Sequence, residues 1–573
     1  MARPDTRATP RSRLIRTAML GGLLLAIAPA GAFAQPAKLS SAPAQPGINL
    51  DPIFASITPT GPGCAVGLGL GKASTLIQTY GLADLEHPAP ITAQTVFETG
   101  SLAKQFTASA VLLLVQDGKL SLDDDIRRYL PELPDYGTPI TLRHLLTHTS
   151  GLREQWSLLA LAGNPPGSQV HSQATILDLA SRQKGLNFKP GAEFLYTNTN
   201  FALAAIIVER VSGQSLQAFT DQRLFQPLGM SQTRWREDFR TVVPGRATAY
   251  SPADKGFIAN MPFTNVYGNG GLLTTAGDLL RWNGFLDTPS ALPGGPALVA
   301  ALEAPGHLSN GAPLDYALGL EVTRDHGRRL VSHSGSTAGY KTWLGRYPDE
   351  GISIVVMCNN GGVDPIALGE AVAEQALVAT GHPAAAATAP RAVAAAVMAI
   401  PDLTPYQGLF RDPLTDDLMR TQVANGQLIL TRGGSQALTP LGGDRFQRAN
   451  GDLLQFVRKG QTSGELILSR GATRQRFVAV PPAATDSAAL AAYVGTFYSA
   501  ELDTRVTVVR QGDALVMRQT FGVEWPLTPS FADGFTTRLR GTTTFVFARA
   551  DDGRVTGFAA WAGGARNIPF VKQ

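Results

Sequence analysis

Residues 98–107 read Glu-Thr-Gly-Ser-Leu-Ala-Lys-Gln-Phe-Thr. Within them, Ser101 and Lys104 form an S-x-x-K pattern at the start of the apolar run Leu102 to Val115, which lacks glycine and proline. Such a run predicts a buried helix. Residues three apart on a helix lie about 5–6 Å from each other between Cβ atoms, so Lys104 can reach the Ser101 hydroxyl.

A serine at the start of a helix also lies beside free backbone N–H groups and the positive end of the helix dipole. A serine nucleophile needs a base and an oxyanion site, and this segment can supply both. The pattern alone is weak evidence, because Ser181-Arg-Gln-Lys184 repeats it elsewhere in the chain. Two further motifs strengthen the prediction.

The second motif is Tyr196-Thr-Asn198, which precedes the helical pattern of Leu203 to Val211 and is expected in a loop that ends against that helix. A nearby Lys⁺ favours the phenolate form of a tyrosine, and such a pair can remove the serine proton and return it to a leaving group. Asn198 can donate its amide to a substrate carbonyl. The competing Tyr267-Gly-Asn269 continues as Gly-Gly-Leu-Leu and favours a turn near the site.

The third motif is His333-Ser-Gly335, at the end of a strand-like segment. Gly335 would let a ligand approach the backbone closely. The N–H of Ser336 could complete an oxyanion hole with the N–H of Ser101. A histidine in a strand is by itself more often structural, so this motif counts only in combination with the others.

S-x-x-K, Y-x-N and H-x-G, in this order and at these spacings, resemble the class C β-lactamase-like serine hydrolases, a superfamily that also holds DD-peptidases, esterases and D-aminopeptidases. The segments from Pro139 to Leu152 and from Gly270 to Asp278 look like its connecting segments. The resemblance covers about residues 51–380 and implies an α/β (α+β) domain with an antiparallel sheet flanked by helices. It implies Ser101, Lys104 and Tyr196 as catalytic residues and no metal or organic cofactor. The expected substrate-binding residues are Asn198, His333, Gly335 and Ser336.

One position departs from the pattern of penicillin-hydrolysing members, which usually carry a lysine where this chain has His333. The charge of a histidine depends on its environment, so the fixed cation for a substrate carboxylate is missing. This suits esterases and D-amino-acid peptidases or amidases better than a β-lactamase or DD-carboxypeptidase, without excluding β-lactams. A rival of another class is a non-catalytic receptor for peptidoglycan fragments or β-lactams.

The N-terminus accounts for the excess positive charge of the chain. Residues 1–34 carry five Arg and one Asp, then an apolar stretch and an Ala-Phe-Ala site, which together predict a signal peptide cleaved after Ala34. Their removal lowers the formal charge from +4 to zero, which disfavours a nucleic-acid partner. We expect a periplasmic or secreted protein without stable membrane insertion. Its expected partners are a small-molecule or peptide substrate and cell-wall fragments.

After residue 402 the sequence changes to short β-type runs separated by turn residues, and these runs repeat. Tyr406-Gln-Gly-Leu-Phe410 recurs as Tyr493-Val-Gly-Thr-Phe497, and two further pairs follow at a similar offset. The repeat predicts two small all-β antiparallel units, each a barrel or sandwich. In full, the expected organisation is a signal peptide (1–34), a flexible lead-in (35–50), a hydrolase domain (51–380), an Ala/Pro linker (381–402) and two β domains (403–482 and 487–573).

Three further features stay open or are set aside. The only cysteines, Cys64 and Cys358, lie in strand-like runs and could form a disulfide or remain two buried thiols. His144 and His148 are four apart, but no third ligand accompanies them, so a packed helix surface is favoured over zinc. Trp525 and Trp561 could be sugar platforms in the β units, although core positions are the simpler interpretation.

Overall fold

The computed structural model describes residues 48–382 except 72–73, and residues 400–573 except 433, 471–472, 484–486, 520–521 and 540. The expected signal peptide, most of the lead-in and most of the linker lie outside the described residues. In the described part, no helix is long and apolar enough to span a membrane.

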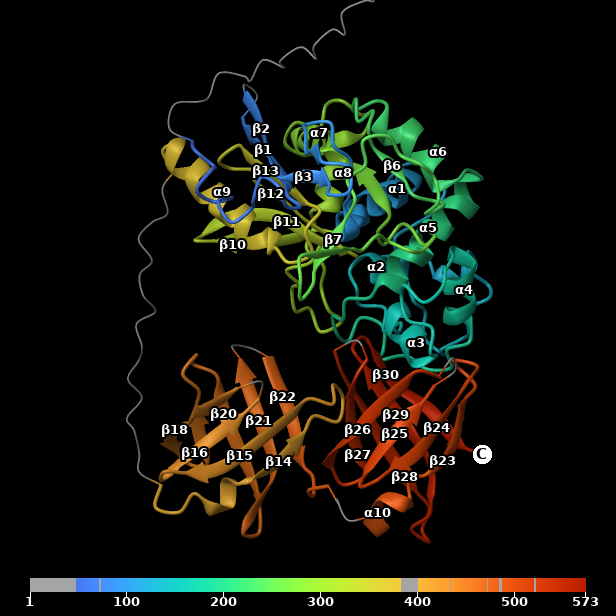
Figure 1. The fold of residues 1–573 in the computed structure, drawn as a ribbon, viewed down its shortest axis with the longest axis vertical. Helices are drawn as coiled ribbons and strands as arrows, with labels where there is room; N and C mark the ends of the chain where they lie inside the picture. Colours follow the sequence, from blue (N-terminus) through green and yellow to red (C-terminus); the bar gives the residue numbers. More distant parts are fainter. Residues whose placement is uncertain are drawn as a thin grey trace, which may run out of the picture. The chain divides into compact units, whose positions relative to one another are not determined.

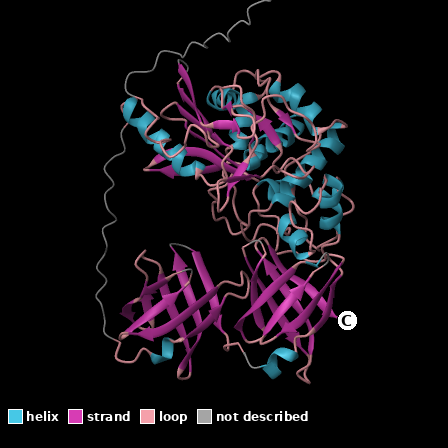
Figure 2. Cartoon of the chain, in the orientation of Figure 1, coloured by secondary structure: helices cyan, strands magenta, loops and turns pink. Residues whose placement is uncertain are grey.

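The first large region is built around a six-stranded antiparallel sheet (Figures 1 and 2). Strand β13 is buried along its whole length because both faces of the sheet are covered. Its alternate residues Val355 and Met357 join a core with helices α1 (Ala103–Gln116) and α7 (Ala276–Asp287). Ile354 and Val356 join a second core with helix α9 (Pro365–Ala379). The strand order is β10 (Glu321–Asp325), β11 (Arg328–Thr337), β12 (Tyr340–Tyr347), β13 (Ile352–Cys358), β1 (Cys64–Leu70) and β2 (Ser74–Tyr80).

The pairing of β1 with β13 joins segments from the two ends of this region. Their register places Cys64 opposite Cys358, and the two cysteines form a disulfide. The question that the sequence left open is therefore answered in favour of the bridge.

Helices α1 (Ala103–Gln116) and α7 pack on the face of the sheet that holds Ser101, whereas α9 covers the opposite face. Every residue of α1 from Ala103 to Leu114 is buried, as its uninterrupted apolar sequence predicts. Helix α5 packs against it. The remaining helices are α2 (Leu142–Leu146), α3 (Gln155–Leu161), α4 (Gln173–Ser181), α5 (Asn198–Ser212), α6 (Leu216–Thr220), α7 (Ala276–Asp287), α8 (Gly295–Leu302), α9 (Pro365–Ala379) and α10 (Ser487–Ala491).

Short strands complete this region. They form a pair of β3 and β4, a pair of β7 and β8, and a three-stranded sheet in the order β5-β9-β6. The last of these joins the segment before Ser101 to segments far along the chain. Their bounds are β3 (Leu82–Asp84), β4 (Ala89–Pro90), β5 (Phe97–Glu98), β6 (Arg234–Trp235), β7 (Tyr250–Pro252), β8 (Phe257–Ala259) and β9 (Leu272–Thr274).

The C-terminal region forms two antiparallel β units, which confirms the predicted fold class. The first is a nine-stranded sheet in the order β17-β16-β15-β14-β22-β21-β20-β19-β18, and the second is a closed barrel of β23 to β30 (Figure 1). The first unit contains β14 (Gly408–Arg411), β15 (Leu418–Ala424), β16 (Gln427–Thr431), β17 (Ser435–Ala437), β18 (Thr439–Gly442), β19 (Arg445–Gln447), β20 (Leu453–Lys459), β21 (Thr462–Arg470) and β22 (Thr473–Ala479). The barrel contains β23 (Gly495–Ser499), β24 (Thr504–Gln511), β25 (Ala514–Arg518), β26 (Glu524–Phe531), β27 (Gly534–Arg538), β28 (Thr542–Arg549), β29 (Val555–Ala562) and β30 (Ala565–Lys572).

The repeat seen in the sequence has a counterpart in side-chain contacts. In the first unit Tyr406 donates a hydrogen bond to Asp444, and Arg458 lies over the tyrosine ring. In the barrel Tyr493 donates to Asp533 and is covered by Arg549 in the same way. Both aspartates have a positive φ, near +60°, so the same turn is also repeated.

Candidate active site

Ser101 lies in a short 3₁₀ turn, Gly100–Leu102, that leads directly into α1. Strand β11 passes very close to this turn. A Cβ on Gly335 would lie 1.9 Å from the Thr99 carbonyl oxygen, and one on Gly100 would lie 2.6 Å from the Ser336 nitrogen. Two glycines therefore allow the strand to reach the serine, and they bring the backbone of Ser336 beside that of Ser101.

Lys104 is completely buried, and its amine has three neighbours. Nζ lies 2.9 Å from Ser101 Oγ, 2.9 Å from Asn198 Oδ1 and 2.7 Å from the Asn269 carbonyl oxygen. Burial lowers the pKa of Lys104 well below its ordinary value, against the opposing influence of Glu154. A neutral amine has two N–H donors for the two carbonyl oxygens, which leaves its lone pair for the Ser101 hydroxyl.

Tyr196 contacts the same serine from another direction. Its hydroxyl donates a hydrogen bond of 2.8 Å to Ser101 Oγ. Burial raises the pKa of Tyr196, so the tyrosine keeps its proton. The sequence suggested a phenolate beside Lys⁺; the structure differs because burial disfavours the charged form of both groups.

His333 lies on β11 and is almost fully buried. Its Nδ1 is 2.6 Å from the Ser334 carbonyl oxygen, to which the ring N–H donates, and its Nε2 is 2.9 Å from the Tyr316 hydroxyl. Burial and the neighbouring Lys104 lower the pKa of His333 to about 4. The third motif therefore presents a neutral imidazole rather than a cation.

The structure brings the predicted residues together to different degrees. Ser101, Lys104, Tyr196 and Asn198 form one hydrogen-bonded group. Gly335 and Ser336 adjoin that group through the backbone, and the His333 ring lies 6.3 Å from the Tyr196 ring between centroids. The second S-x-x-K pattern forms no such group, because Ser181 donates to the Asp178 carbonyl oxygen within α4.

The sequence analysis missed Glu154. This residue caps the N-terminus of α3 by accepting a hydrogen bond of 2.8 Å from the Ser157 N–H. Its other carboxylate oxygen accepts one of 3.0 Å from Asn198 Nδ2, so an acidic side chain lies next to the Asn198–Lys104 pair. An acidic residue before an apolar helix is a recognisable capping signal, but nothing in the sequence connects it to a residue 44 positions away.

The barrel contributes to this corner of the site through the turn between β29 and β30. The Gly564 carbonyl oxygen accepts hydrogen bonds from the Glu154 N–H at 3.0 Å and from Asn187 Nδ2 at 2.7 Å. A Cβ on Gly564 would lie 2.6 Å from the Glu154 Cβ. Arg153 also forms a buried ion pair with Glu501. The carboxylate of the site is thus held from two parts of the chain.

His144 and His148 are not placed as metal ligands. Helix α2 ends at Leu146, so the expectation that both histidines share a helix face is wrong: His148 follows the helix with a φ of 56°. It packs on the Tyr196 ring at 4.2 Å between centroids. Among the described residues, the group with a geometry that could hold a metal is the surface cluster Asp84, Glu86 and His87.

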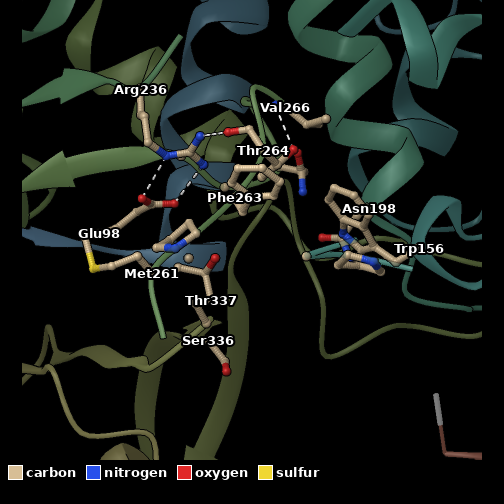
Figure 3. Close-up of a pocket in the computed structure, with 18 of the residues that line it drawn as sticks. Glu98, Trp156, Asn198, Arg236, Met261, Phe263, Thr264, Val266, Ser336 and Thr337 are labelled. Carbon is tan, nitrogen blue, oxygen red and sulfur yellow. Dashed lines mark hydrogen bonds and ion pairs between the residues drawn. The ribbon is translucent and has the colours of Figure 1, made fainter. Parts of the chain in front are cut away.

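A cavity of about 350 Å³ opens beside Ser101. Figure 3 shows Asn198 and Trp156 on one side of it and Arg236 and Glu98 on the other. Gly270, Ser336 and Thr337 also line it. The cavity provides room for a substrate between the nucleophile and a largely polar wall.

Comparison with known proteins identifies the family of the chain. The Beta-lactamase family profile matches residues 59–377, more than half of the chain. The chain belongs to this family. The predicted resemblance to the class C β-lactamase-like serine hydrolases is confirmed.

Among curated relatives, a D-aminopeptidase of Brucella canis is 31% identical over 304 residues, which are 53% of this chain and 57% of the relative. A D-aminopeptidase of Brucella anthropi is 30% identical over 310 residues, 54% of this chain and 58% of the relative. The chain thus covers less than two thirds of these relatives.

Solved structures agree on the fold. A penicillin-binding protein of Bacillus halodurans has a TM-score of 0.50 at 25% identity and covers 57% of this chain and 98% of its own. An octameric penicillin-binding protein homologue of Pyrococcus abyssi has a TM-score of 0.51 at 23% identity and covers 74% of this chain and 97% of its own.

Proposed function

We propose that the protein is an exported serine hydrolase that forms an acyl intermediate on Ser101 and hydrolyses amides of D-amino acids with a free amino group. The observation that carries the proposal is the position of the Ser101 hydroxyl, 2.9 Å from a buried lysine amine and 2.8 Å from a buried tyrosine hydroxyl.

The reaction follows from these contacts. The Ser101 proton passes to the neutral Lys104 amine while Oγ bonds to the substrate carbonyl carbon. The N–H groups of Ser101 and Ser336 stabilise the oxyanion. When the C–N bond breaks, Tyr196 gives its proton to the leaving amine, and the proton held by the Lys104 ammonium restores the tyrosine, so that both groups are again neutral in the acyl-enzyme. Water then attacks the acyl ester, its proton is taken up by the same pair, and Ser101 is released with its proton.

The amino-group specificity rests on Glu154. Its buried carboxylate adjoins Asn198, and the side-chain oxygen of cavity-lining Asn269 is buried without a hydrogen-bond partner among the described residues. A carboxylate and a free acceptor suit a substrate ammonium group. The curated relatives named D-aminopeptidase support this choice.

The neutral His333 argues against β-lactams and DD-peptides as main substrates, because the third motif supplies no cation at the position where penicillin-hydrolysing members usually carry a lysine. A panel of D-Phe and L-Phe p-nitroanilides, a p-nitrophenyl ester, a D-Ala-D-Ala peptide and nitrocefin tests this. We expect the D-anilide to give the highest kcat/KM. A higher value for nitrocefin or the D-Ala-D-Ala peptide would transfer the assignment to a β-lactamase or DD-carboxypeptidase.

Mass spectrometry of the protein with excess D-Phe p-nitrophenyl ester tests the acyl intermediate. We expect one acyl group on Ser101, several turnovers per molecule, and neither in Ser101→Ala. Turnover by Ser101→Ala would exclude the mechanism, and stable labelling without turnover would identify a non-catalytic receptor.

The pH dependence tests Lys104 as the base. Because its neutral form accepts the proton, kcat/KM should fall as the pH drops through the lowered pKa of Lys104. His333, with a pKa of about 4, should add no inflection between pH 6 and 8. If the residual kcat/KM of Lys104→Met still falls at the same low pH, Lys104 is not the base.

The export part of the proposal is supported by residues 1–34 and by the Cys64–Cys358 disulfide, which suits an oxidising compartment. Expression of the full chain in a bacterium, followed by N-terminal sequencing of the periplasmic fraction, tests it. We expect a mature protein that begins at Gln35; cytosolic protein that retains residues 1–34 would refute it.

A further inference from the structure

The cavity wall that holds Arg236 carries more positive than negative charge. Glu98 accepts hydrogen bonds of 2.9 and 3.0 Å from Arg236 and a further one of 3.0 Å from Arg246. Arg246 also donates one of 3.1 Å to the Tyr340 hydroxyl. One carboxylate thus faces two guanidinium groups, and this cluster has a net charge of +1.

The charges of this cluster act in a low-dielectric setting. The side chains of Glu98, Arg236 and Arg246 are 0%, 3% and 10% exposed. Interactions between such groups and a ligand are weakly screened by solvent. Of the acidic residues that follow Arg236, Asp238 pairs with Arg240, and Glu237, which hydrogen-bonds Ser215, does not line this cavity.

The opposite side of the cavity has the opposite polarity. Glu154 adjoins Asn198 there, and burial lowers the pKa of the nearby Lys104 amine, which shifts that amine toward its uncharged form. Figure 3 shows Arg236 and Glu98 facing Asn198 and Trp156 across the cavity. A ligand that spans the cavity therefore has the cationic cluster at one end and, at the other end, Asn198 with the Glu154 carboxylate bonded to it.

We propose that the Arg236 side of the cavity binds the free C-terminal carboxylate of a short peptide whose ammonium group lies near Glu154. The inference rests on the proposed function and narrows its substrates to zwitterionic di- and tripeptides. Two or three extended residues span about 7–11 Å, a length that suits a cavity of about 350 Å³. Arg246 also pairs with Glu98, so the cluster keeps one positive charge for the substrate, and Arg236 is the arginine of the cluster that lines the cavity.

The test compares D-Phe-Gly with its amide, D-Phe-Gly-NH₂, because the two differ only in the terminal carboxylate. We expect the unmodified protein to favour the free acid about 10-fold in kcat/KM. Arg246→Met should remove most of this preference by raising KM for the acid alone, since Glu98 then neutralises Arg236. Arg246→Lys should retain it.

A second variant changes the charge in the other direction. Glu98→Gln leaves both arginines uncompensated and should raise the acid-to-amide ratio about 3-fold. Arg143→Met, which removes an exposed arginine paired with Asp123, is the matched control and should leave the ratio unchanged. Because each ratio is internal to one protein, partial misfolding of a variant does not alter it.

The outcomes separate this inference from the proposed function. Absence of turnover of D-Phe p-nitroanilide would remove the proposed function itself. If the anilide is turned over but the acid-to-amide ratio is near one, only the carboxylate site is overturned. The same holds if Glu98→Gln and Arg246→Met leave that ratio unchanged. If Arg246→Met does not fold, the Glu98→Gln ratio decides.

Discussion

The two C-terminal β units repeat the same Tyr–Asp–Arg arrangement but differ in what their cores include. The core of the first unit consists of its own residues, from Tyr406 to Phe477. The core of the barrel is continuous with Leu158 and Leu161 of α3 and Ile176 of α4. The barrel therefore shares its core with the hydrolase region, whereas the first unit has a core of its own. The two units differ because the barrel core contacts α3 and α4, and not because of the Tyr–Asp–Arg arrangement, which both units share.

The largest contrast should come from core truncation. Phe558→Ala in the barrel and Phe456→Ala in the first unit should each destabilise the unit that holds them by about 3–5 kcal/mol. Only Phe558→Ala should also lower the temperature at which hydrolase activity is lost, because its core continues into α3 and α4. Thermal inactivation and calorimetric scans of both variants measure this. Equal loss of activity in both would mean that the two units support the site alike.

The buried ion pair between Arg153 and Glu501 should give the next largest effect. Arg153→Met leaves Glu501 buried without its main cationic partner, which costs about 3 kcal/mol. We also expect lower kcat/KM, since Arg153 precedes Glu154. Arg476→Met removes an exposed pair of the first unit with Glu465 and serves as control. If denaturant unfolding shows no difference between the variants, the interface with the barrel contributes little.

The contact of Gly564 with Glu154 should affect substrate use more than stability. Gly564→Ala places a methyl group against the Glu154 Cβ and should lower kcat/KM for D-Phe p-nitroanilide about 10-fold. Gly434→Ala in the first unit meets no atom within 4 Å and should have no effect. If Gly564→Ala lowers kcat/KM equally for an ester that lacks the amino group, the substitution disturbs the whole active site rather than displacing Glu154.

The smallest effects on stability should come from the tyrosine–aspartate hydrogen bond that both units share. Tyr406→Phe and Tyr493→Phe each remove one hydrogen bond to an aspartate and should cost about 1 kcal/mol in the free energy of unfolding of their unit. Urea titration monitored separately for each unit measures both losses. A clearly larger cost in the barrel would show that its docking also depends on this motif.

Much of the site could be predicted because its chemistry is local in sequence. Ser101 and Lys104 face each other through helical spacing. Tyr196 does precede a helix as predicted, but that helix begins at Asn198, which the sequence analysis places in the loop before it. The protonation states could not be predicted in the same way. Burial lowers the pKa of Lys104 and of His333, and burial depends on segments that lie far apart in the chain.

The sequence by itself determined the catalytic motifs, the buried helix α1 and the repeated β units, because periodicity and short spacing are properties of neighbouring residues. Only the tertiary structure decided the Cys64–Cys358 bridge, the place of Glu154 beside Asn198 and the sharing of the barrel core with α3 and α4. Each of these joins residues tens to hundreds of positions apart, and their contacts exist only once the sheet, the helices and the barrel pack together.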